Sequence, residues 1–185
     1  MYHQFVQVLG LKILLLFLLT GCSDGDSAQA EGTENNGYEE PHEQRDQLWN
    51  SLEEAQGKAS ENDKWVLIDI YTEWCAYCRQ MYNETYTNQR VIDKLNEYFY
   101  VTRVDAESDE MVKFNGEELS MERLAAEFGV TSYPTTVIVK PDGEPFAIQP
   151  GYIEADQFTG ILTYVGTDAY EDVSFDEYME EFDDQ

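Results

Sequence analysis

The apolar residues of this chain fall into short continuous runs separated by stretches with helical spacing. The runs at 65–71 and 99–104 predict two strands, and the first is apolar enough to be buried on both faces of a sheet. Two further short runs, 135–139 and 144–148, flank the turn sequence Pro141-Asp142-Gly143 and predict an antiparallel hairpin.

Helices are predicted between these strands. Leu48, Trp49, Leu52 and Ala55 have the spacing of a first helix that begins near residue 44. Further helices are predicted at 75–86, at 88–98, from the N-cap residue Ser120 to Gly129, and on the apolar face Phe158, Ile161, Leu162 and Val165, with a polar loop at 107–118. Helical crossovers imply parallel strands and the hairpin an antiparallel edge, so the expected fold class is α/β with a mixed sheet.

The first 21 residues predict a lipoprotein signal peptide. The apolar run at 13–19 is too short to cross a bilayer, and it leads into Leu19-Thr20-Gly21-Cys22, which resembles the bacterial lipobox. That motif implies cleavage before Cys22 and lipid on its sulfur. The location implied is extracytoplasmic, on a bacterial membrane and facing the periplasm, with inner or outer membrane left open. The alternatives are an ordinary signal peptide and an uncleaved short anchor.

The rest of the chain divides by composition into three parts. Residues 22–43 are rich in Gly, Ser, Asn and acids and predict a flexible acidic tether. Residues 44–166 form the predicted folded domain. In the acidic tail 167–185, a possible helix carries Phe175, Tyr178, Met179 and Phe182 on one face. It is expected to fold back on the domain, with a docking helix for a partner as the alternative.

Composition and charge exclude several classes of function. Of the 185 residues, 42% are hydrophobic and 14% aromatic, which is too apolar for a wholly disordered chain. The formal net charge of −27 argues against nucleic acid as a partner. His3 and His42 both precede the predicted domain, so histidine triads and histidine metal sites are excluded there. No metal site is expected.

The candidate chemistry lies where the first strand ends and a helix begins. Cys75 and Cys78 stand three residues apart, so they can close a small disulfide ring. Cys75 falls at the positive end of the predicted helix dipole, which stabilises a thiolate. Cys78, one turn further on, is expected to be less exposed and to serve as the resolving thiol. The alternatives are a structural disulfide and half of a zinc site, but a bridge this short stabilises little and zinc lacks its other ligands.

These motifs resemble those of the thioredoxin family. The segment 66–78 is similar to its active-site strand and turn, Ser132-Tyr133-Pro134-Thr135 to its cis-proline loop, and Gly151-Tyr152 to the glycine turn that follows. The resemblance covers roughly 48–165 and implies the thioredoxin fold, with a central mixed sheet flanked by helices. Within the family, the chain most resembles the exported members close to the C-terminal domain of the transmembrane disulfide reductase, and those linked to periplasmic sulfur metabolism.

The resemblance also assigns roles to individual residues. Cys75 would attack and Cys78 would resolve, while Asp69 would be a buried acid of raised pKa that relays the Cys78 proton. Trp74 would shield the disulfide, and a cis Pro134 would set the backbone of Tyr133 beside Cys75 to pair with substrate. The alternatives are a half-exposed Asp69, simple packing of Trp74 and a trans-proline turn.

One departure from the family concerns the partner of Asp69. The family often places a lysine on the neighbouring strand, but alignment on Val104-Asp105 puts Val101 at that position, with Arg103 two residues further on. Proton handling around Asp69 is therefore the weakest part of the resemblance.

The function expected is that of a thiol–disulfide oxidoreductase that reduces disulfides in extracytoplasmic proteins. Its partners would be disulfide-containing proteins, a membrane electron donor, and the membrane itself through lipid on Cys22. No cofactor is expected beyond the dithiol. The alternatives are a disulfide oxidase or isomerase, and a non-catalytic lipoprotein that uses a thioredoxin fold as a binding scaffold.

Overall fold

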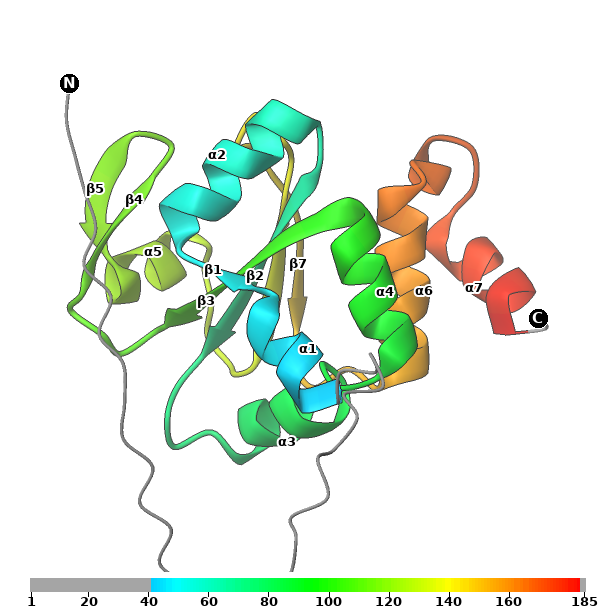
Figure 1. The fold of residues 1–185 in the computed structure, drawn as a ribbon, viewed down its shortest axis with the longest axis horizontal. Helices are drawn as coiled ribbons and strands as arrows, with labels where there is room; N and C mark the ends of the chain where they lie inside the picture. The colour runs from blue at the N-terminus through cyan, green and yellow to red at the C-terminus, as the bar shows by residue number, and fades with distance from the viewer. Residues whose placement is uncertain (1–40, 184–185) are drawn as a thin grey trace, which may run out of the picture. The chain divides into compact units, whose positions relative to one another are not determined.

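The computed structural model describes residues 41–183 (Figure 1). The predicted signal peptide, the lipidation site Cys22 and the tether up to residue 40 lie outside the described residues. In chain order the elements are α1 (Pro41–Gln47), β1 (Trp49–Asn50), α2 (Leu52–Asn62), β2 (Trp65–Tyr71), α3 (Ala76–Glu84), α4 (Gln89–Tyr98), β3 (Phe99–Asp105), β4 (Met111–Phe114), β5 (Glu117–Ser120), α5 (Met121–Glu127), β6 (Thr135–Val139), β7 (Pro145–Pro150), α6 (Ala155–Gly166), a 3₁₀ turn (Ala169–Glu171) and α7 (Phe175–Asp183).

A five-stranded mixed sheet, in the order β1-β3-β2-β6-β7, forms the centre of the domain. Strands β1 and β2 both run parallel to β3, whereas β6 is antiparallel to β2 and β7 to β6. The predicted α/β class and the antiparallel hairpin edge are confirmed. Pro145 is the first residue of the edge strand β7, a position where a residue without a backbone N–H is tolerated.

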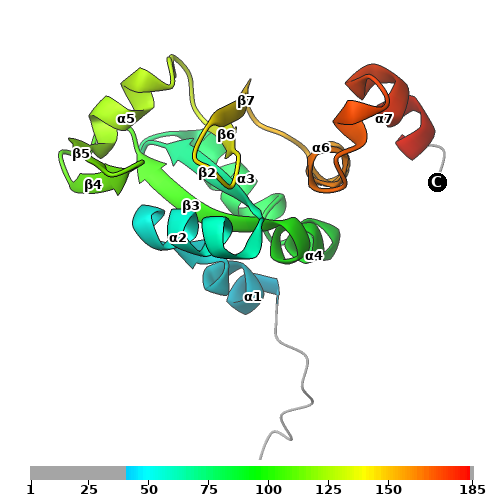
Figure 2. The same cartoon turned by 90° about the horizontal axis from the view of Figure 1, so that it is seen from above.

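Both faces of the sheet are covered by helices, because alternate residues of each buried strand point to opposite sides. On one face, Leu67 and Val101 pack in a cluster with residues of α3, α4 and α6. On the other face, Ile68 and Val104 pack with residues of α2 and α5. Figure 2 shows α6 and α7 at one end of this arrangement and α5 with the β4–β5 hairpin at the other.

The first predicted helix is wrong as a continuous element. The four residues that share this spacing do not lie in one helix: α1 ends at Gln47, just before Leu48, Trp49 lies in β1, and Leu52 and Ala55 lie in α2. Trp49 and Asn50 pair with β3 instead, and Ser51 begins a new helix with a capping box shared with Glu54. The physical reason is that β1 forms the edge of the sheet by pairing with β3. Helical periodicity reflects only residues close in sequence and does not report such a long-range contact.

The predicted polar loop at 107–118 is also wrong, since it contains the β4–β5 hairpin. Asn115 and Gly116 both have positive φ angles, as a two-residue hairpin turn requires. Leu119 is the residue that this hairpin buries against the cluster under α2 and α5. One buried apolar residue among charged neighbours is a weak periodic signal, which explains the error.

Helix α7 lies against α6. The Tyr164 hydroxyl donates to the Val173 carbonyl at 2.7 Å, and its ring contacts those of Phe175 and Tyr178. Gly160 leaves room for Met179, because a Cβ at position 160 would overlap the Met179 sulfur. This is the folded-back arrangement rather than a free docking helix. None of the helices in residues 41–183 is long and apolar enough to cross a membrane.

Candidate redox site

Cys75 and Cys78 form a disulfide at the N-terminus of α3, with their Cα atoms 5.3 Å apart. Cys75 is the N-cap residue of that helix, and its Sγ accepts a hydrogen bond from the backbone N–H of Cys78 at 3.0 Å. In the reduced protein the same N–H and the helix dipole favour a negative charge on Cys75. The two residues are buried to a similar degree, with 4% and 3% exposed, so the expected difference in exposure is not seen in the disulfide form.

Two aromatic side chains next to the disulfide are turned toward solvent. Trp74 is 64% exposed and Tyr77 is 63% exposed, which is unusual for such large apolar groups. The Trp74 indole N–H donates to Glu107 Oε2 at 2.9 Å, and its ring meets Tyr133 edge to face with ring centroids 6.0 Å apart. Trp74 is therefore held at the rim of the site by Glu107 and Tyr133, and most of its surface is available to a substrate.

The loop before β6 has the form that the family resemblance implied. The Tyr133–Pro134 peptide bond is cis. The carbonyl of Pro134 accepts a hydrogen bond from Gly151 N at 2.7 Å, and Thr135 Oγ1 donates to the Ser132 carbonyl. Gly151 has a φ of 96°, a conformation that side chains disfavour. The predicted proline loop and glycine turn are thus tied together.

Asp69 lies in the middle of β2 and is 2% exposed, so the half-exposed alternative is wrong. Arg103 Nε donates to its Oδ2 at 2.8 Å. Burial raises the pKa of the Asp69 carboxyl above its ordinary value, and the Arg103 guanidinium offsets part of that rise. A buried acid of this kind suits the proton-relay role that the resemblance assigned to it.

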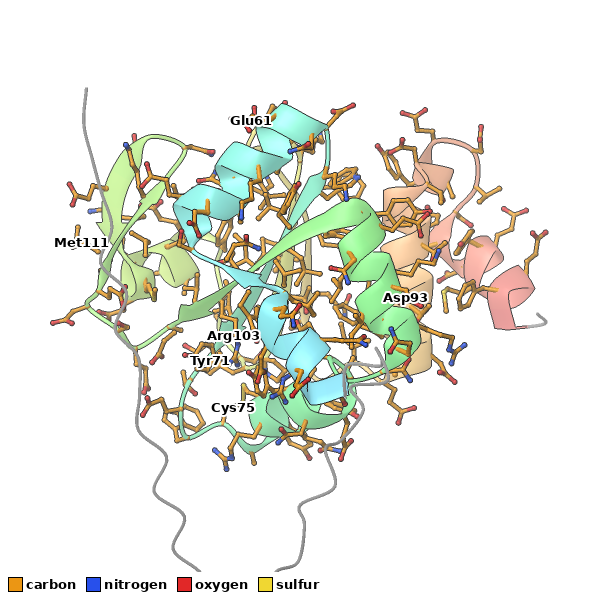
Figure 3. The ribbon with its side chains drawn as sticks, viewed as in Figure 1. Glu61, Tyr71, Cys75, Asp93, Arg103 and Met111 are labelled. Atoms are coloured by element: carbon orange, nitrogen blue, oxygen red, sulfur yellow. A yellow bond between two sulfur atoms is a disulfide. The ribbon has the colours of Figure 1, made fainter. Side chains whose placement is uncertain are left out.

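The predicted register of β3 needs a correction. The structure pairs Asp69 with Arg103 and Leu67 with Val101, so Arg103, not Val101, stands beside the acid. Tyr71 and Asp105 end the two strands together, and aligning those ends would have found the pair. Arg103 is also the one Lys or Arg in the β2 and β3 sequences. Figure 3 shows Arg103 and Tyr71 close together, with Cys75 nearby at the start of α3.

No group of three or more His, Cys, Asp or Glu side chains in residues 41–183 is arranged to hold a metal ion. The chemistry available in this part of the chain is that of the dithiol and its buried acid. With the redox pair at a helix N-terminus, a buried acid in the strand that leads to it and a cis-proline loop, the arrangement suits thiol–disulfide exchange.

Comparison with known proteins agrees with this geometry. Residues 52–166 match the family described as thioredoxin-like domain. The chain belongs to this thioredoxin-like family. A thioredoxin-fold protein from Helicobacter pylori has a similar structure, with a TM-score of 0.57 and 26% identity over 66% of this chain and 81% of that one. A thioredoxin from Thermus thermophilus, 23% identical with a TM-score of 0.52, covers 63% of this chain and 85% of its own, and it supports the fold.

One curated relative of this thioredoxin-like chain is a much larger protein. The thiol:disulfide interchange protein DsbD of Actinobacillus pleuropneumoniae is 31% identical over an alignment of 120 residues, and the match covers 60% of this chain. The match covers only 18% of that relative's length. The similarity is therefore to one part of DsbD.

Proposed function

We propose that this chain is a thiol–disulfide oxidoreductase that reduces disulfide bonds in proteins outside the cytoplasm, while lipid on Cys22 holds it at a membrane. The observation that carries the proposal is the Cys75–Cys78 pair at the N-terminus of α3. The exposed rings of Trp74 and Tyr77 border this pair. Such a surface suits a protein substrate, which needs apolar contact beside the attacked sulfur. The similarity to the thiol:disulfide interchange protein DsbD supports exchange chemistry, and the resemblance of the sequence motifs to the transmembrane disulfide reductase favours the reducing direction.

In the proposed cycle, the Cys75 thiolate attacks a substrate disulfide. One substrate sulfur leaves as a thiolate, and the other is joined to Cys75 in a mixed disulfide. Asp69 then takes the proton from Cys78, whose thiolate attacks Cys75 Sγ. The Cys75–substrate bond breaks, the Cys75–Cys78 bond forms, and the second substrate sulfur leaves as a thiolate. The substrate gains two electrons and the dithiol loses them, so the dithiol ends the cycle oxidised.

A reductase that ends each cycle oxidised needs a donor of two electrons. We infer a membrane protein with a dithiol of its own, because exchange between dithiols returns the electrons without a cofactor in this chain. Lipid on Cys22 would keep the domain close to such a donor. The acidic domain gains nothing from anionic lipid headgroups, so the lipid itself would provide the attachment.

The reduction potential of the Cys75–Cys78 couple tests the direction of the reaction. The full chain in detergent is equilibrated with glutathione buffers of known potential. Thioredoxin has a potential near −270 mV, and a strong oxidant of this fold has one near −120 mV. A value near the lower figure supports the proposal, whereas a value near the upper one assigns the chain to disulfide formation or isomerisation and contradicts it.

The lipid anchor needs its own test. Bacteria that express the full chain are labelled with radioactive palmitate, and the chain is recovered from membranes. Label that disappears in Cys22→Ala and persists in Cys75→Ala supports lipid on Cys22. Unlabelled wild-type chain would overturn that part of the proposal and leave the redox chemistry intact.

A further inference from the structure

The ion pair between Arg103 and Asp69 is covered by a segment that precedes the family domain. Residues 41–50 contain α1 and β1, whereas the thioredoxin-like match begins at residue 52. The short strand β1 pairs with β3 at Val101 and Thr102, immediately before Arg103. This pairing places the Trp49 ring 5.2 Å from the Arg103 guanidinium carbon.

Arg103 is enclosed by aromatic rings. Its guanidinium carbon lies 3.9 Å from the centre of the Tyr71 ring and 4.5 Å from that of Tyr82. Trp49 and Tyr82 are themselves stacked, with centroids 5.9 Å apart and an interplanar angle of 24°. We call Trp49, Tyr71 and Tyr82 the aromatic cage. Cation–π contacts of this kind restrict a long side chain that would otherwise sample many rotamers.

Helix α1 fixes the cage from outside. The Arg45 guanidinium carbon lies 3.9 Å from the centre of the Tyr82 ring, which also lies within contact of Arg103. The Tyr82 hydroxyl donates to Asp46 Oδ1 at 3.0 Å, and Asp46 also pairs with Arg45. Arg45 is only 7% exposed, so α1 is packed firmly on α3 at this point.

The buried position of Trp49 leaves its indole N–H without a hydrogen bond among the described residues. A buried N–H without a partner is destabilising and asks for an explanation. The ring contacts with Tyr82, Tyr86 and Arg103 supply one, because they use the shape of the indole and not its polar atom.

We propose that residues 41–50 are a working part of the redox domain, in which Trp49 and the rest of the cage hold Arg103 on Asp69 and make Arg103 the positioning residue for the acid that takes the Cys78 proton. This inference rests on the proposed relay role of Asp69. It extends the active unit beyond the family domain, to a segment that includes the last residues of the predicted tether, 41–43.

Several other titratable groups lie near Asp69 and Arg103. Burial raises the pKa values of Tyr71, Tyr82 and Tyr86, so all three phenols stay neutral in the range where Asp69 acts. Arg45 and Asp46 neutralise each other above the cage. The other charged groups on this side include Asp105, which ends β3 opposite Tyr71, Glu73, which follows β2, and Arg79, which donates to the Glu73 carbonyl at 2.8 Å.

A pocket of about 450 Å³ borders both Arg103 of the ion pair and Cys78 of the redox site. Its walls include Cys78 and Arg103, together with Tyr71, Thr72 and Tyr82. If Arg103 leaves Asp69, the carboxyl loses the interaction that lowers its pKa, and a larger fraction is already protonated at neutral pH and unable to accept the Cys78 proton.

The test uses a small probe in place of a protein substrate. The full chain in detergent is reduced and mixed with the aryl disulfide 5,5′-dithiobis(2-nitrobenzoate), and the release of two thionitrobenzoate anions is followed at 412 nm. The second release reports the attack of Cys78 on the mixed disulfide at Cys75. The leaving group of this second release is the thionitrobenzoate anion, which needs no proton. The acid limb of the pH–rate profile therefore reports the removal of the Cys78 proton by Asp69.

Five variants separate positioning from stability. Arg103→Met and Trp49→Leu are expected to move the acid limb to higher pH and to slow the second release about threefold or more at pH 6. Trp49→Phe retains an aromatic ring and should keep the wild-type pH–rate profile. Arg103→Lys retains the positive charge and should restore part of that profile. The matched control is Trp65→Leu, because Trp65 is a buried tryptophan on the same sheet face that contacts Phe146 and Tyr170 and not Arg103.

The outcomes are distinct. An unchanged acid limb in Arg103→Met, or the same shift in Trp65→Leu as in Trp49→Leu, would overturn the inference. Tyr82→Leu, at a half-buried position, gives the same test if Trp49→Leu does not fold. The probe is not a protein, so this test does not depend on the physiological substrate. If the chain does not reduce exported proteins, the proposed function is contradicted, but the result for Arg103 and Trp49 still stands.

Discussion

Arg103 stands directly opposite Asp69 in the parallel register of β3 and β2, and its Nε donates to Asp69 Oδ2 across 2.8 Å. The pair joins residues 34 positions apart in the chain and lies on the sheet face that α3 covers. Burial dominates over this ion pair, so the net effect is a raised pKa for Asp69. The Asp69 carboxylate can therefore accept a proton at a higher pH than an exposed aspartate can, and its ionised form destabilises the folded domain.

Asp69→Asn is expected to raise stability at neutral pH and to slow the second step of exchange. The pKa of Asp69 is higher in the folded than in the unfolded chain, so its contribution to stability is fully present below the unfolded value, near 3.9, and is lost as pH rises through the folded pKa. The stability gain of the variant should therefore shrink as pH is lowered. Loss of a general base should slow Cys78 attack about 10²-fold.

Urea unfolding at several pH values and the two-phase probe assay measure these effects. Asp93→Asn is a suitable control, since Asp93 is an exposed acid on α4, well away from Cys75 in Figure 3. A stability gain that grows toward low pH would contradict the sign worked out above.

The two cysteines should have different phenotypes. Cys75→Ser removes the attacking thiolate and should abolish disulfide reduction. Cys78→Ser removes the resolving thiol, so mixed disulfides with substrates should accumulate on Cys75. Non-reducing gels of cells that express each variant measure this, with the double variant as control. Equal adduct formation by both single variants would contradict the assigned order.

Trp74→Ala should weaken substrate binding more than chemistry. Trp74 is largely exposed beside the disulfide and is anchored by Glu107, so its ring is available to a protein partner. We expect kcat/KM for a protein disulfide to fall about tenfold or more, with little change in the first thionitrobenzoate release. Met111→Ala is the control, because Met111 is a 54% exposed apolar residue on the β4–β5 hairpin, remote from Cys75 in Figure 3.

Two glycines in helices should respond to alanine in opposite ways. A Cβ at Gly166 would overlap the Tyr98 ring and its Cβ, where α6 crosses α4, so Gly166→Ala should destabilise the domain by about 1–3 kcal/mol. At Gly57 in α2 nothing lies within 4 Å of an added Cβ, and Gly57→Ala should stabilise by up to about 1 kcal/mol. Thermal unfolding of both variants measures the difference. Similar shifts would mean that α4 and α6 do not pack as described.

The sequence alone determined the features that depend on neighbours in the chain. The strand–Cys-x-x-Cys–helix arrangement, the Pro-Asp-Gly hairpin and the Ser120 cap each depend on residues within one or two turns. Local spacing determines such features, because hydrogen bonds and side-chain contacts within a helix or hairpin act over a few residues. They were sufficient to identify the redox pair and the fold.

Only the tertiary structure decided how distant segments pair. It placed Arg103 beside Asp69, divided the first helical pattern so that β1 could join β3, and set Trp49 against Arg103. Strand register and edge pairing depend on the packing of a whole sheet between its helices, which residue spacing within one segment does not encode. The chemistry of the dithiol is thus readable from the chain, whereas the environment of its acid is a property of the folded sheet.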